Sequence, residues 1–557
     1  MTTPEQSRRS PISVALSPRA ARSQAPVHPA HTLRVVRWIS GWLWWEGVGI
    51  SVLLVVALFL RAHHLTSLPA GIHGDEAVFG TEGEVVLHHG LVGPYSYLIA
   101  GQPTGPFYLN AIAVAVFGHT IFAVRVVSML VGTLTIPLCY LVLQRSFDRT
   151  TGFVGATLLA VMNWHLHFSR IGFALALWLF GVVLTTGALV EAIRHQSWRW
   201  WAATGIAAGL NIYVYNAHPL FLAILLLFIA AYCIRALMTR VLSLRTCVRN
   251  VVVLAIALGV TAYPMGAFVL RDREHYFASL SPRSVFNYHE WQLLTTTHAR
   301  VTFLAARYIQ YWDHISFHPQ LDGGDATGVI PTIPPALLVL ALSGIVLALF
   351  RHRTPLVAFS LCVIFLMPFA SVFTVDGLSR RTFASAAFVA MFAALPFVEA
   401  IKFGWAQGTL YGKAIGAGLS GVIFLLVSYQ GLHAYFGTFA DSPQQAYYFT
   451  NEMTDAARFM ATLPTDSYVY FYSDRWSVKY ETRQFLAPNI RAEDRSAEFG
   501  HLGFDVDPTK GKPVFVFLGK YRPMYDAARE RYPQGTLLLG SAAGRPTFVA
   551  YVVGTGP

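Results

Sequence analysis

An acidic pair, Asp75-Glu76, follows the first long apolar run of the chain, in the stretch from Gly71 to Ala77. A carboxylate can take a proton from an acceptor hydroxyl while that oxygen attacks an electrophile, so the pair is a candidate for general-base catalysis. A helix from about residue 75 to 88 would place both acids in its first turn, where they stabilise the helix dipole by about 0.3–1 kcal/mol. On the residues alone, the catalytic and the structural interpretation both stay open.

Metal chemistry has no clear motif in this sequence. Histidines are frequent, but no HExxH or comparable ligand spacing occurs. The four cysteines lie in apolar runs or in a basic loop, and none forms a CxxC pair, so we interpret them as buried or reduced thiols. We predict that no cofactor is required, with a divalent metal as the open alternative.

The composition indicates that a membrane-embedded body positions the acidic pair. Of the 557 residues, 54% are hydrophobic and only 13% are charged, whereas soluble domains carry about 25% charged residues. A spanning helix needs roughly 20 mostly apolar residues. We therefore predict an α-helical polytopic membrane protein, and its about eleven spans lie at 42–60, 120–144, 152–168, 171–193, 199–214, 217–237, 250–270, 331–350, 355–374, 382–401 and 412–432. The apolar run 105–117 is too short to span and is predicted to be a re-entrant or surface helix.

Basic residues set the predicted orientation. Residues 1–35 are rich in Ser, Pro and Arg and are predicted to form a disordered cytoplasmic tail. With this tail inside, every loop on the cytoplasmic side contains Lys or Arg, as the positive-inside rule requires. The formal charge of +12 is therefore a topology signal, since no basic stripe with interleaved aromatic residues suggests nucleic acid. We predict a multi-pass protein of the plasma or inner membrane.

This orientation divides the chain into a transmembrane domain, 36–437, and an extracytoplasmic domain, 438–557. The loops 61–119 and 271–330 fall on the extracytoplasmic side, so we expect the active site there. In the second loop, apolar residues recur from Trp291 to Trp312 at helical spacing. They predict either an amphipathic helix at the membrane interface or a helix packed on the C-terminal domain.

The C-terminal domain is predicted to be a small α/β domain. Apolar, β-rich runs at 468–472, 514–518, 536–539 and 548–553 alternate with helical patterns at 452–463 and 524–532. It has no Gly-rich phosphate loop, so no chemistry is assigned to it.

Several short motifs follow one another in order on the predicted outer face. They are Asp75-Glu76, Gln102-Pro103-Thr104-Gly105-Pro106-Phe107-Tyr108, Phe117-Gly118, Ala123-Val124-Arg125, Ser169-Arg170 and, more weakly, Arg380-Arg381. In this pattern the chain resembles the bacterial members of the protein O-mannosyltransferase superfamily, which are related to the enzymes that add aminoarabinose to lipid A. Two features depart from the family pattern: Gln102 stands where the family often has Lys, and no acid closely follows Arg170.

The resemblance implies a GT-C fold and a polyprenyl-phosphate sugar donor that enters from the bilayer. Asp75 would be the general base and Glu76 a supporting carboxylate. Since the leaving group is a phosphate, Arg170, Arg380 and Arg381 would clamp it with their planar guanidinium groups. Interfacial snorkelling or lipid headgroup binding is the structural alternative for these arginines. For Arg380-Arg381 the functional interpretation is favoured, because two adjacent arginines on the predicted outer side oppose the orientation bias. Further donor-binding candidates are Gln102, Tyr108 and His218, while Asp313, Asp322 and Asp325 either contribute to an acceptor site or solvate their loop.

We therefore predict an inverting membrane glycosyltransferase, a hexosyl- or pentosyltransferase. It would move a sugar from a polyprenyl-phosphate donor to a protein, lipid or cell-envelope glycan acceptor, with membrane lipids but no nucleic acid among its partners. One alternative is an oligosaccharyltransferase or glycan polymerase, which a divalent-metal requirement would favour. A secondary transporter is another, although the ionisable residues lie at an outer mouth and no inverted repeat occurs. A receptor or scaffold that displays the C-terminal domain is the non-enzymatic alternative.

Overall fold

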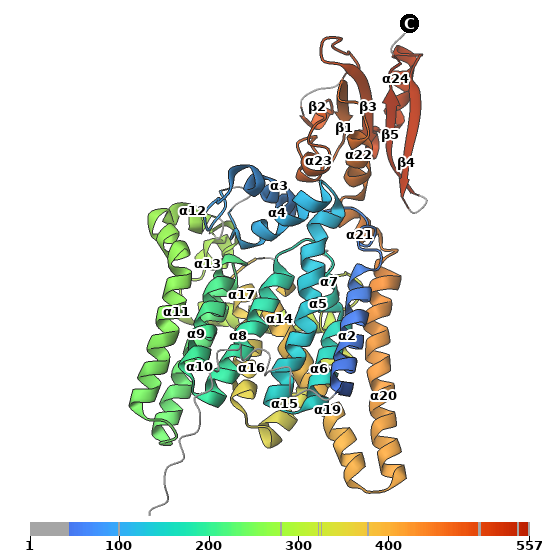
Figure 1. Cartoon of the computed structure of the whole chain (residues 1–557). Helices are drawn as coiled ribbons and strands as arrows, with labels where there is room; N and C mark the ends of the chain where they lie inside the picture. The colour runs from blue at the N-terminus through green and yellow to red at the C-terminus, as the bar shows by residue number, and fades with distance from the viewer. Residues whose placement is uncertain are drawn as a thin grey trace, which may run out of the picture. The chain divides into compact units, whose positions relative to one another are not determined.

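The computed structural model describes residues 44–97, 101–278, 281–320, 322, 324, 326–375, 378–499, 503–542 and 545–554. The tail predicted at residues 1–35 and Asp325 lie outside these residues. The chain divides into two compact units, Met1–Gly49 and Ile50–Pro557. In the first unit the described residues, 44–49, begin helix α2 (Trp44–Ala62). All other elements belong to the second unit (Figure 1).

Helices occupy every predicted span. In the part of the chain that the structure describes, eight helical segments are long and apolar enough to cross a membrane. They are α2, α5 (Ile121–Ser146), α8 (Leu175–His195), α10 (His218–Met238), α11 (Leu244–Arg271), the segment 355–372 with α16 (Pro355–Leu366) and α17 (Phe369–Val372), the segment 378–406 with α18 (Leu378–Thr382) and α19 (Ala386–Ala406), and α20 (Leu410–His433) with the π-helix η5 (Ala434–Phe439). These segments confirm a polytopic helical membrane body.

The remaining three predicted spans are shorter helices. The span predicted at 152–168 is interrupted at Met162, whose extended backbone separates α6 (Arg149–Val161) from α7 (Asn163–Phe168). The second is α9 (Trp198–Leu210), which continues as the 3-10 turn η1 (Asn211–Tyr213), and the third is α15 (Pro335–Arg351). The total of eleven spans therefore stays a prediction.

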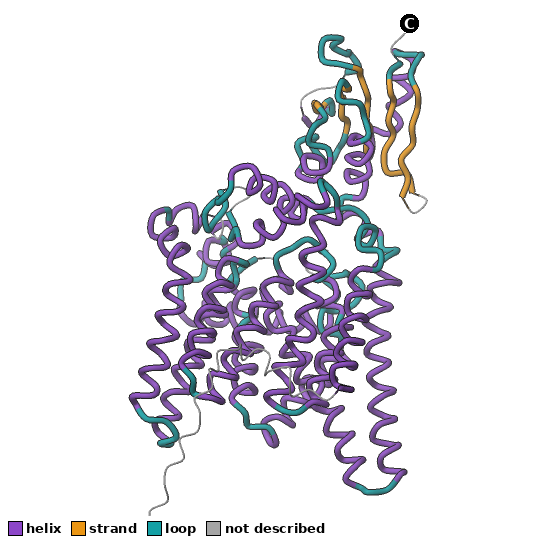
Figure 2. The backbone as a smooth tube through the Cα atoms, viewed as in Figure 1, coloured by secondary structure: helices purple, strands orange, loops and turns teal. Residues whose placement is uncertain are grey.

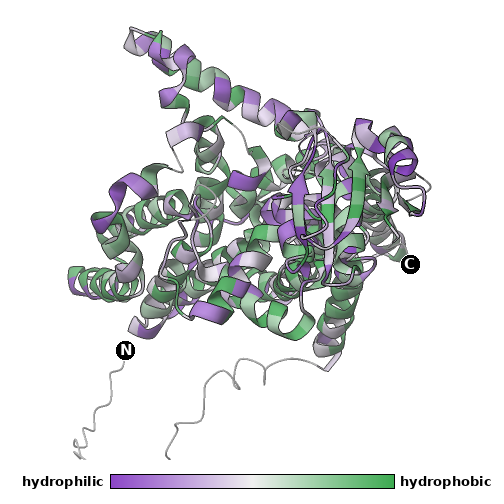
Figure 3. Ribbon diagram, turned by 90° about the horizontal axis from the view of Figure 1, so that it is seen from above, coloured by the Kyte–Doolittle hydropathy of each residue, from purple (hydrophilic) through white to green (hydrophobic). Residues whose placement is uncertain are grey.

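The helices of the membrane body differ in how much of their surface other helices cover. The core helices α5, α8 and α19 are mostly buried, while α11 and α20 leave most of their apolar surface exposed. A helix that is apolar all round needs either protein or lipid around it. Figure 2 shows the long helices running roughly parallel to one another, and in Figure 3, seen from above, hydrophobic residues prevail over the helices. The exposed apolar faces of α11 and α20 fit contact with lipid.

The two predicted outer loops also fold into helices. The first loop forms α3 (Gly74–His89) and α4 (Gly105–Phe117), which lie above the ends of the spanning helices in Figure 1. The rings of Phe79 and Phe107 join them in an edge-to-face contact at 5.6 Å. The 13 residues of α4 confirm a helix too short to span. The second loop forms α12 (Arg273–Ala278), the turns η2 (Ser281–Arg283) and η3 (Val285–Asn287), α13 (His289–Gln292) and α14 (Thr297–Phe317).

Helix α14 packs its aromatic residues on the membrane body. Tyr308 lies 5.3 Å from Phe369, and Trp312 lies 6.1 Å from Phe365, measured between ring centroids. Arg307 donates to the carbonyls of the same region, at Val372 (2.9 Å) and Thr374 (2.5 Å). These contacts attach the predicted helix to α16 and α17.

The C-terminal residues form an α/β domain, as predicted. One five-stranded sheet has the order β2-β1-β3-β5-β4, in which β1 pairs in parallel with β2 and β3, and β5 runs antiparallel to β3 and β4. The strands are β1 (Ser467–Tyr472), β2 (Arg491–Asp494), β3 (Lys512–Leu518), β4 (Thr536–Ala542) and β5 (Arg545–Val552), and the helices are α21 (Pro443–Tyr448), α22 (Asn451–Ala461), α23 (Glu481–Leu486) and α24 (Tyr525–Arg531), with the turns η6 (Ala497–Phe499) and η7 (Gly519–Met524). The central strands read as continuous apolar runs because core clusters cover both faces of the sheet.

Candidate active site

A capping box fixes where α3 begins and therefore where the acidic pair points. The ring Nδ1 of His73 accepts a hydrogen bond from the backbone N–H of Asp75 (3.0 Å), and Glu76 Oε1 accepts one from the N–H of His73 (3.3 Å). Consecutive helical residues project about 100° apart. Asp75 consequently points outward with 52% of its side chain exposed, while the side chain of Glu76 is fully buried.

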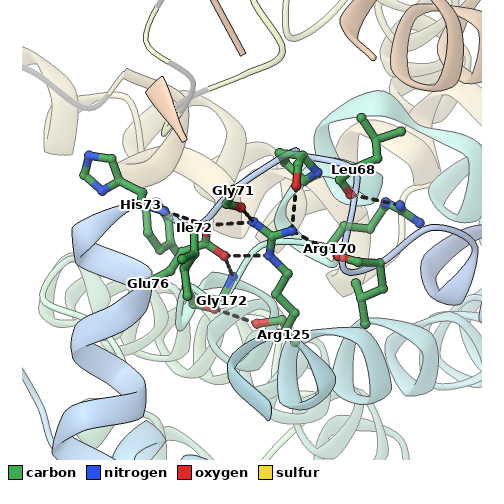
Figure 4. A network of polar contacts seen from close by, with 12 residues as sticks. Leu68, Gly71, Ile72, His73, Glu76, Arg125, Arg170 and Gly172 are labelled. Carbon is green, nitrogen blue, oxygen red and sulfur yellow. Dashed lines mark hydrogen bonds and ion pairs between the residues drawn. The ribbon is translucent and has the colours of Figure 1, made fainter. Parts of the chain in front are cut away.

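Glu76 forms a buried ion pair with Arg125 (Figure 4). Arg125 reaches its carboxylate with two groups, Nε to Oε2 at 2.9 Å and Nη2 to Oε1 at 3.1 Å. The backbone N–H of Gly172 donates to Oε2 at 2.7 Å. The remaining donor capacity of Arg125 goes to the carbonyls of Leu65, Pro69 and Gly71. Glu76 therefore ties the loop before α3 to the membrane body and does not line the cavity described below.

Arg170, predicted as part of a phosphate clamp, has a similar structural position and does not line the cavity described below. Its guanidinium is buried and donates four hydrogen bonds to backbone carbonyls, those of Leu60, Arg61, His63 and Leu68, at 2.6–3.0 Å. Its flat face covers the ring of Tyr435 at 5.2 Å. The arginines of the Ala-Val-Arg and Ser-Arg motifs thus hold carbonyls at the end of α2 and in the loop that follows it, between residues 60 and 71.

Asp75 opens into a cavity of about 600 Å³. The charged side chains around it are two acids and three arginines, namely Asp75, Asp322, Arg283, Arg380 and Arg381. Arg380 pairs with Asp322 at 3.3 Å. A set of apolar residues lines another part of the wall: Val78, Phe79, Phe173, Leu175, Leu220, Phe286 and Phe373. One cavity therefore joins a carboxylate, a cationic group and an apolar surface.

The aromatic residue beside Asp75 comes from the C-terminal domain, at the end of α21. Tyr448 lines the cavity, and its ring stacks on His73 with centroids 4.5 Å apart and an interplanar angle of 7°. His73 in turn lies 3.8 Å from the carboxylate of Asp75. The ring of Tyr448 thus packs on His73, the N-cap residue of the helix that carries the candidate base.

The structure brings four of the eight predicted site residues to this cavity: Asp75, Gln102, Arg380 and Arg381. Glu76 and Arg170 hold the loop instead. Tyr108 does not line the cavity, and its hydroxyl accepts from the N–H of Val92 at 3.2 Å. His218 does not line the cavity either, and it is buried between Trp178 Nε1 (3.2 Å) and the carbonyl of Ala208 (2.9 Å).

Sequence reasoning missed Arg283 and Tyr448. Arg283 is a basic residue on the predicted outer side, so the orientation rule that drew attention to Arg380-Arg381 applied to it as well. Tyr448 carried no such signal, because it lies 373 positions from Asp75 in a segment with no motif. Among the described residues, no group of three or more His, Cys, Asp or Glu side chains is arranged to hold a metal ion.

Comparison with known proteins identifies the fold. Residues 101–263 match the sequence model of the family described as dolichyl-phosphate-mannose-protein mannosyltransferase. ArnT from Cupriavidus metallidurans, solved bound to undecaprenyl phosphate, is similar with a TM-score of 0.50 and 13% identity, over 91% of this chain and 98% of that chain. The Archaeoglobus fulgidus oligosaccharyltransferase, solved with a tethered acceptor peptide, is similar with a TM-score of 0.50 and 14% identity, over 92% of this chain and 74% of that chain.

No curated protein sequence matches this chain. The likeness to the two solved structures extends over the membrane body and the C-terminal domain together, because it covers more than nine-tenths of the chain. The chain therefore has the GT-C fold of polytopic membrane glycosyltransferases, and its residues 101–263 resemble the dolichyl-phosphate-mannose-protein mannosyltransferases.

Proposed function

We propose that this protein is an inverting glycosyltransferase that moves a sugar from a polyprenyl phosphate to an acceptor hydroxyl outside the cytoplasm. The observation that carries the proposal is the single cavity that Asp75 shares with Arg283, Arg380 and Arg381. ArnT, which shares the fold, was solved with undecaprenyl phosphate. A phosphate needs cationic partners and an acceptor hydroxyl needs a base, and this cavity supplies both.

The reaction needs one displacement. The acceptor oxygen attacks the anomeric carbon, the bond from that carbon to the phosphate oxygen breaks, and the polyprenyl phosphate leaves with the electron pair. Asp75 takes the proton of the acceptor hydroxyl as its oxygen attacks, so that no positive charge builds up on that oxygen. The arginines offset the growing charge on the phosphate through charge-assisted hydrogen bonds. A single displacement inverts the anomeric centre.

The size of the cavity favours a small sugar. A volume of about 600 Å³ falls in the range of small-molecule sites, about 300–1,000 Å³. The second candidate is an oligosaccharyltransferase, favoured by the likeness to the Archaeoglobus fulgidus structure. A requirement for a divalent metal and turnover of a lipid-linked oligosaccharide, but not of a lipid-linked monosaccharide, would support that candidate.

The proposed site lies on the extracytoplasmic side of the plasma or inner membrane. In a variant without native cysteines, Leu91→Cys and Thr509→Cys should react with a membrane-impermeant thiol reagent in spheroplasts. Val241→Cys, exposed between α10 and α11, should react only after permeabilisation. Each expectation follows from the Lys and Arg content of the loops. Labelling of positions 241 and 509 from the same side would contradict this orientation.

Arg381→Ala should weaken binding of undecaprenyl phosphate by about 10- to 150-fold, since a hydrogen bond to a charged group contributes about 1.5–3 kcal/mol. Arg381→Lys should lose less, because it keeps the charge but not the planar fork. Binding to the purified protein in detergent measures both. Arg300→Ala is the matched control, because Arg300 also lies on the predicted outer side but stacks on Trp291 and does not line the cavity. Equal affinity of Arg381→Ala and wild type would leave Arg381 an interfacial anchor.

A further inference from the structure

We propose that the C-terminal domain is a positioning element of the active site, which holds the turn Ala70–Gly74 and thereby sets where the Asp75 carboxylate lies. Thr454, Tyr480 and Thr482 are its positioning residues. This inference rests on the proposed role of Asp75 as the base. It gives the domain a function in the reaction that acts through the backbone of the turn, since Thr454, Tyr480 and Thr482 do not line the cavity.

The backbone of Ile72 has its polar groups satisfied entirely by this domain. Its N–H donates to Thr454 Oγ1 at 3.0 Å. Its carbonyl accepts from the hydroxyls of Thr450 and Thr482, each at 2.8 Å. All three threonines are buried. Three short side chains from two different segments therefore fix the backbone of one residue, three positions before Asp75.

Two more hydrogen bonds connect the domain to the two ends of the turn. Gln445 Nε2 donates to the carbonyl of Ala70 at 3.0 Å. The backbone N–H of Gly74, adjacent to Asp75, donates to the hydroxyl of Tyr480 at 3.0 Å. Burial, with a smaller contribution from the charge of Asp75, raises the pKa of Tyr480 to about 12. Its hydroxyl thus stays neutral at physiological pH and remains in place as an acceptor.

Glycine permits this close approach at two positions. Gly71 has a φ of +88°, and a Cβ there would collide with the carbonyl oxygen of Phe449. A Cβ at Gly74 would lie 2.7 Å from the hydroxyl of Tyr480. The backbone of the turn therefore packs directly against the domain, which leaves no room for a side chain at residue 71 or 74.

An apolar contact keeps the domain on α3. Ile72 and Ala77 belong to one buried cluster with Ala457, Phe485 and Leu486 of the domain. Arg125 of the membrane body also holds the turn. It donates a buried hydrogen bond to the carbonyl of Gly71, and this bond would be lost if that carbonyl moved. The turn before Asp75 is thus fixed both by Arg125 of the membrane body and by hydrogen bonds to the C-terminal domain. Misplacing a reacting group by about 1 Å can cost about 100-fold in rate.

The test removes hydroxyls from the domain and asks whether the loss depends on Asp75. Full-length protein carrying Tyr480→Phe with Thr482→Val is assayed with a panel of undecaprenyl-phosphate monosaccharides that starts with the mannose form. We expect kcat to fall about 10- to 100-fold with an unchanged KM for the donor. Backbone amide exchange in residues 70–75 should rise. In an Asp75→Asn background the same pair should cause no further loss, because both changes remove one function.

Tyr551→Phe is the matched control. Its hydroxyl likewise accepts a hydrogen bond from a glycine N–H, that of Gly535 at 3.0 Å. Both residues lie within the C-terminal domain, so this contact does not involve the turn. It should leave kcat unchanged. Wild-type kcat in the Tyr480→Phe, Thr482→Val protein, or an equal further loss in the Asp75→Asn background, would overturn the positioning role. If Asp75→Asn alone keeps wild-type turnover, the proposed function fails instead, so the two failures are distinguishable.

Discussion

Asp75→Asn is expected to lower turnover about 10²- to 10⁴-fold, the usual contribution of a general base. The amide keeps the size of the side chain but cannot take the proton of an acceptor hydroxyl. Stability should change little, because 52% of the Asp75 side chain is exposed and a helix-terminal acid contributes about 0.3–1 kcal/mol. Sugar release from an undecaprenyl-phosphate donor by the purified variant measures the loss, beside a melting curve in detergent.

Asp466→Asn is a suitable control for this variant. Asp466 has a similar exposure, 55%, and pairs with Lys512 in the C-terminal domain, away from the cavity. It should retain wild-type turnover. A folded Asp75→Asn protein with wild-type turnover would return Asp75 to the role of a helix-dipole residue, which the sequence alone left open.

The neighbouring change, Glu76→Gln, is expected to affect folding more than any other substitution considered in this protein. Glu76 and Arg125 both have fully buried side chains, and the carboxylate accepts hydrogen bonds from Arg125, Gly172 and His73. Removing one charge leaves the guanidinium buried without its partner, which costs about 3–5 kcal/mol. A marked fall in the melting temperature and in the monodisperse yield from detergent should result.

Glu84→Gln provides the comparison on the same helix. Glu84 is 31% exposed and faces His119, so its loss should shift the melting temperature only slightly. If Glu76→Gln instead melts like wild type and loses turnover, then Glu76 takes part in the chemistry and the interpretation of the Arg125 pair is wrong.

Local sequence signals predicted the elements well. The helix expected after the acidic pair, from about residue 75 to 88, agrees with α3, Gly74–His89. The short apolar run after Pro103 is indeed a helix of less than span length. Alternating apolar runs in the last hundred residues predicted four of the five strands, while β2, the polar edge strand Arg-Ala-Glu-Asp, lacked the pattern.

The partners of each polar residue could not be predicted, because they lie far apart in the sequence. Asp75 and Glu76 are adjacent and chemically alike, and only the fold shows that one is exposed and the other is paired with Arg125, 49 positions away. Arg170 was predicted to bind phosphate because the family resemblance implies a phosphate donor and a guanidinium matches its geometry. Its four carbonyl partners lie at the end of α2 and in the following loop, more than 100 residues earlier.

Charge orientation was the more informative signal for the cavity itself. Arg380 and Arg381 were selected because adjacent arginines on the outer side oppose the usual bias, and both line the cavity with Asp75. Applied to every outer arginine, the same rule would have included Arg283. The domain contacts through Thr454, Tyr480 and Thr482 had no comparable signal, since hydroxyl residues are common on any domain surface.

The most direct measurement is a structure of the full-length protein with undecaprenyl phosphate bound. The phosphate should lie within about 2.7–2.9 Å of a guanidinium nitrogen of Arg283, Arg380 or Arg381, inside the cavity that Asp75 lines. The polyprenyl chain should leave that cavity along apolar residues of its wall. A phosphate bound elsewhere on the membrane body, with the Asp75 cavity empty at saturating lipid, would contradict the proposed active site.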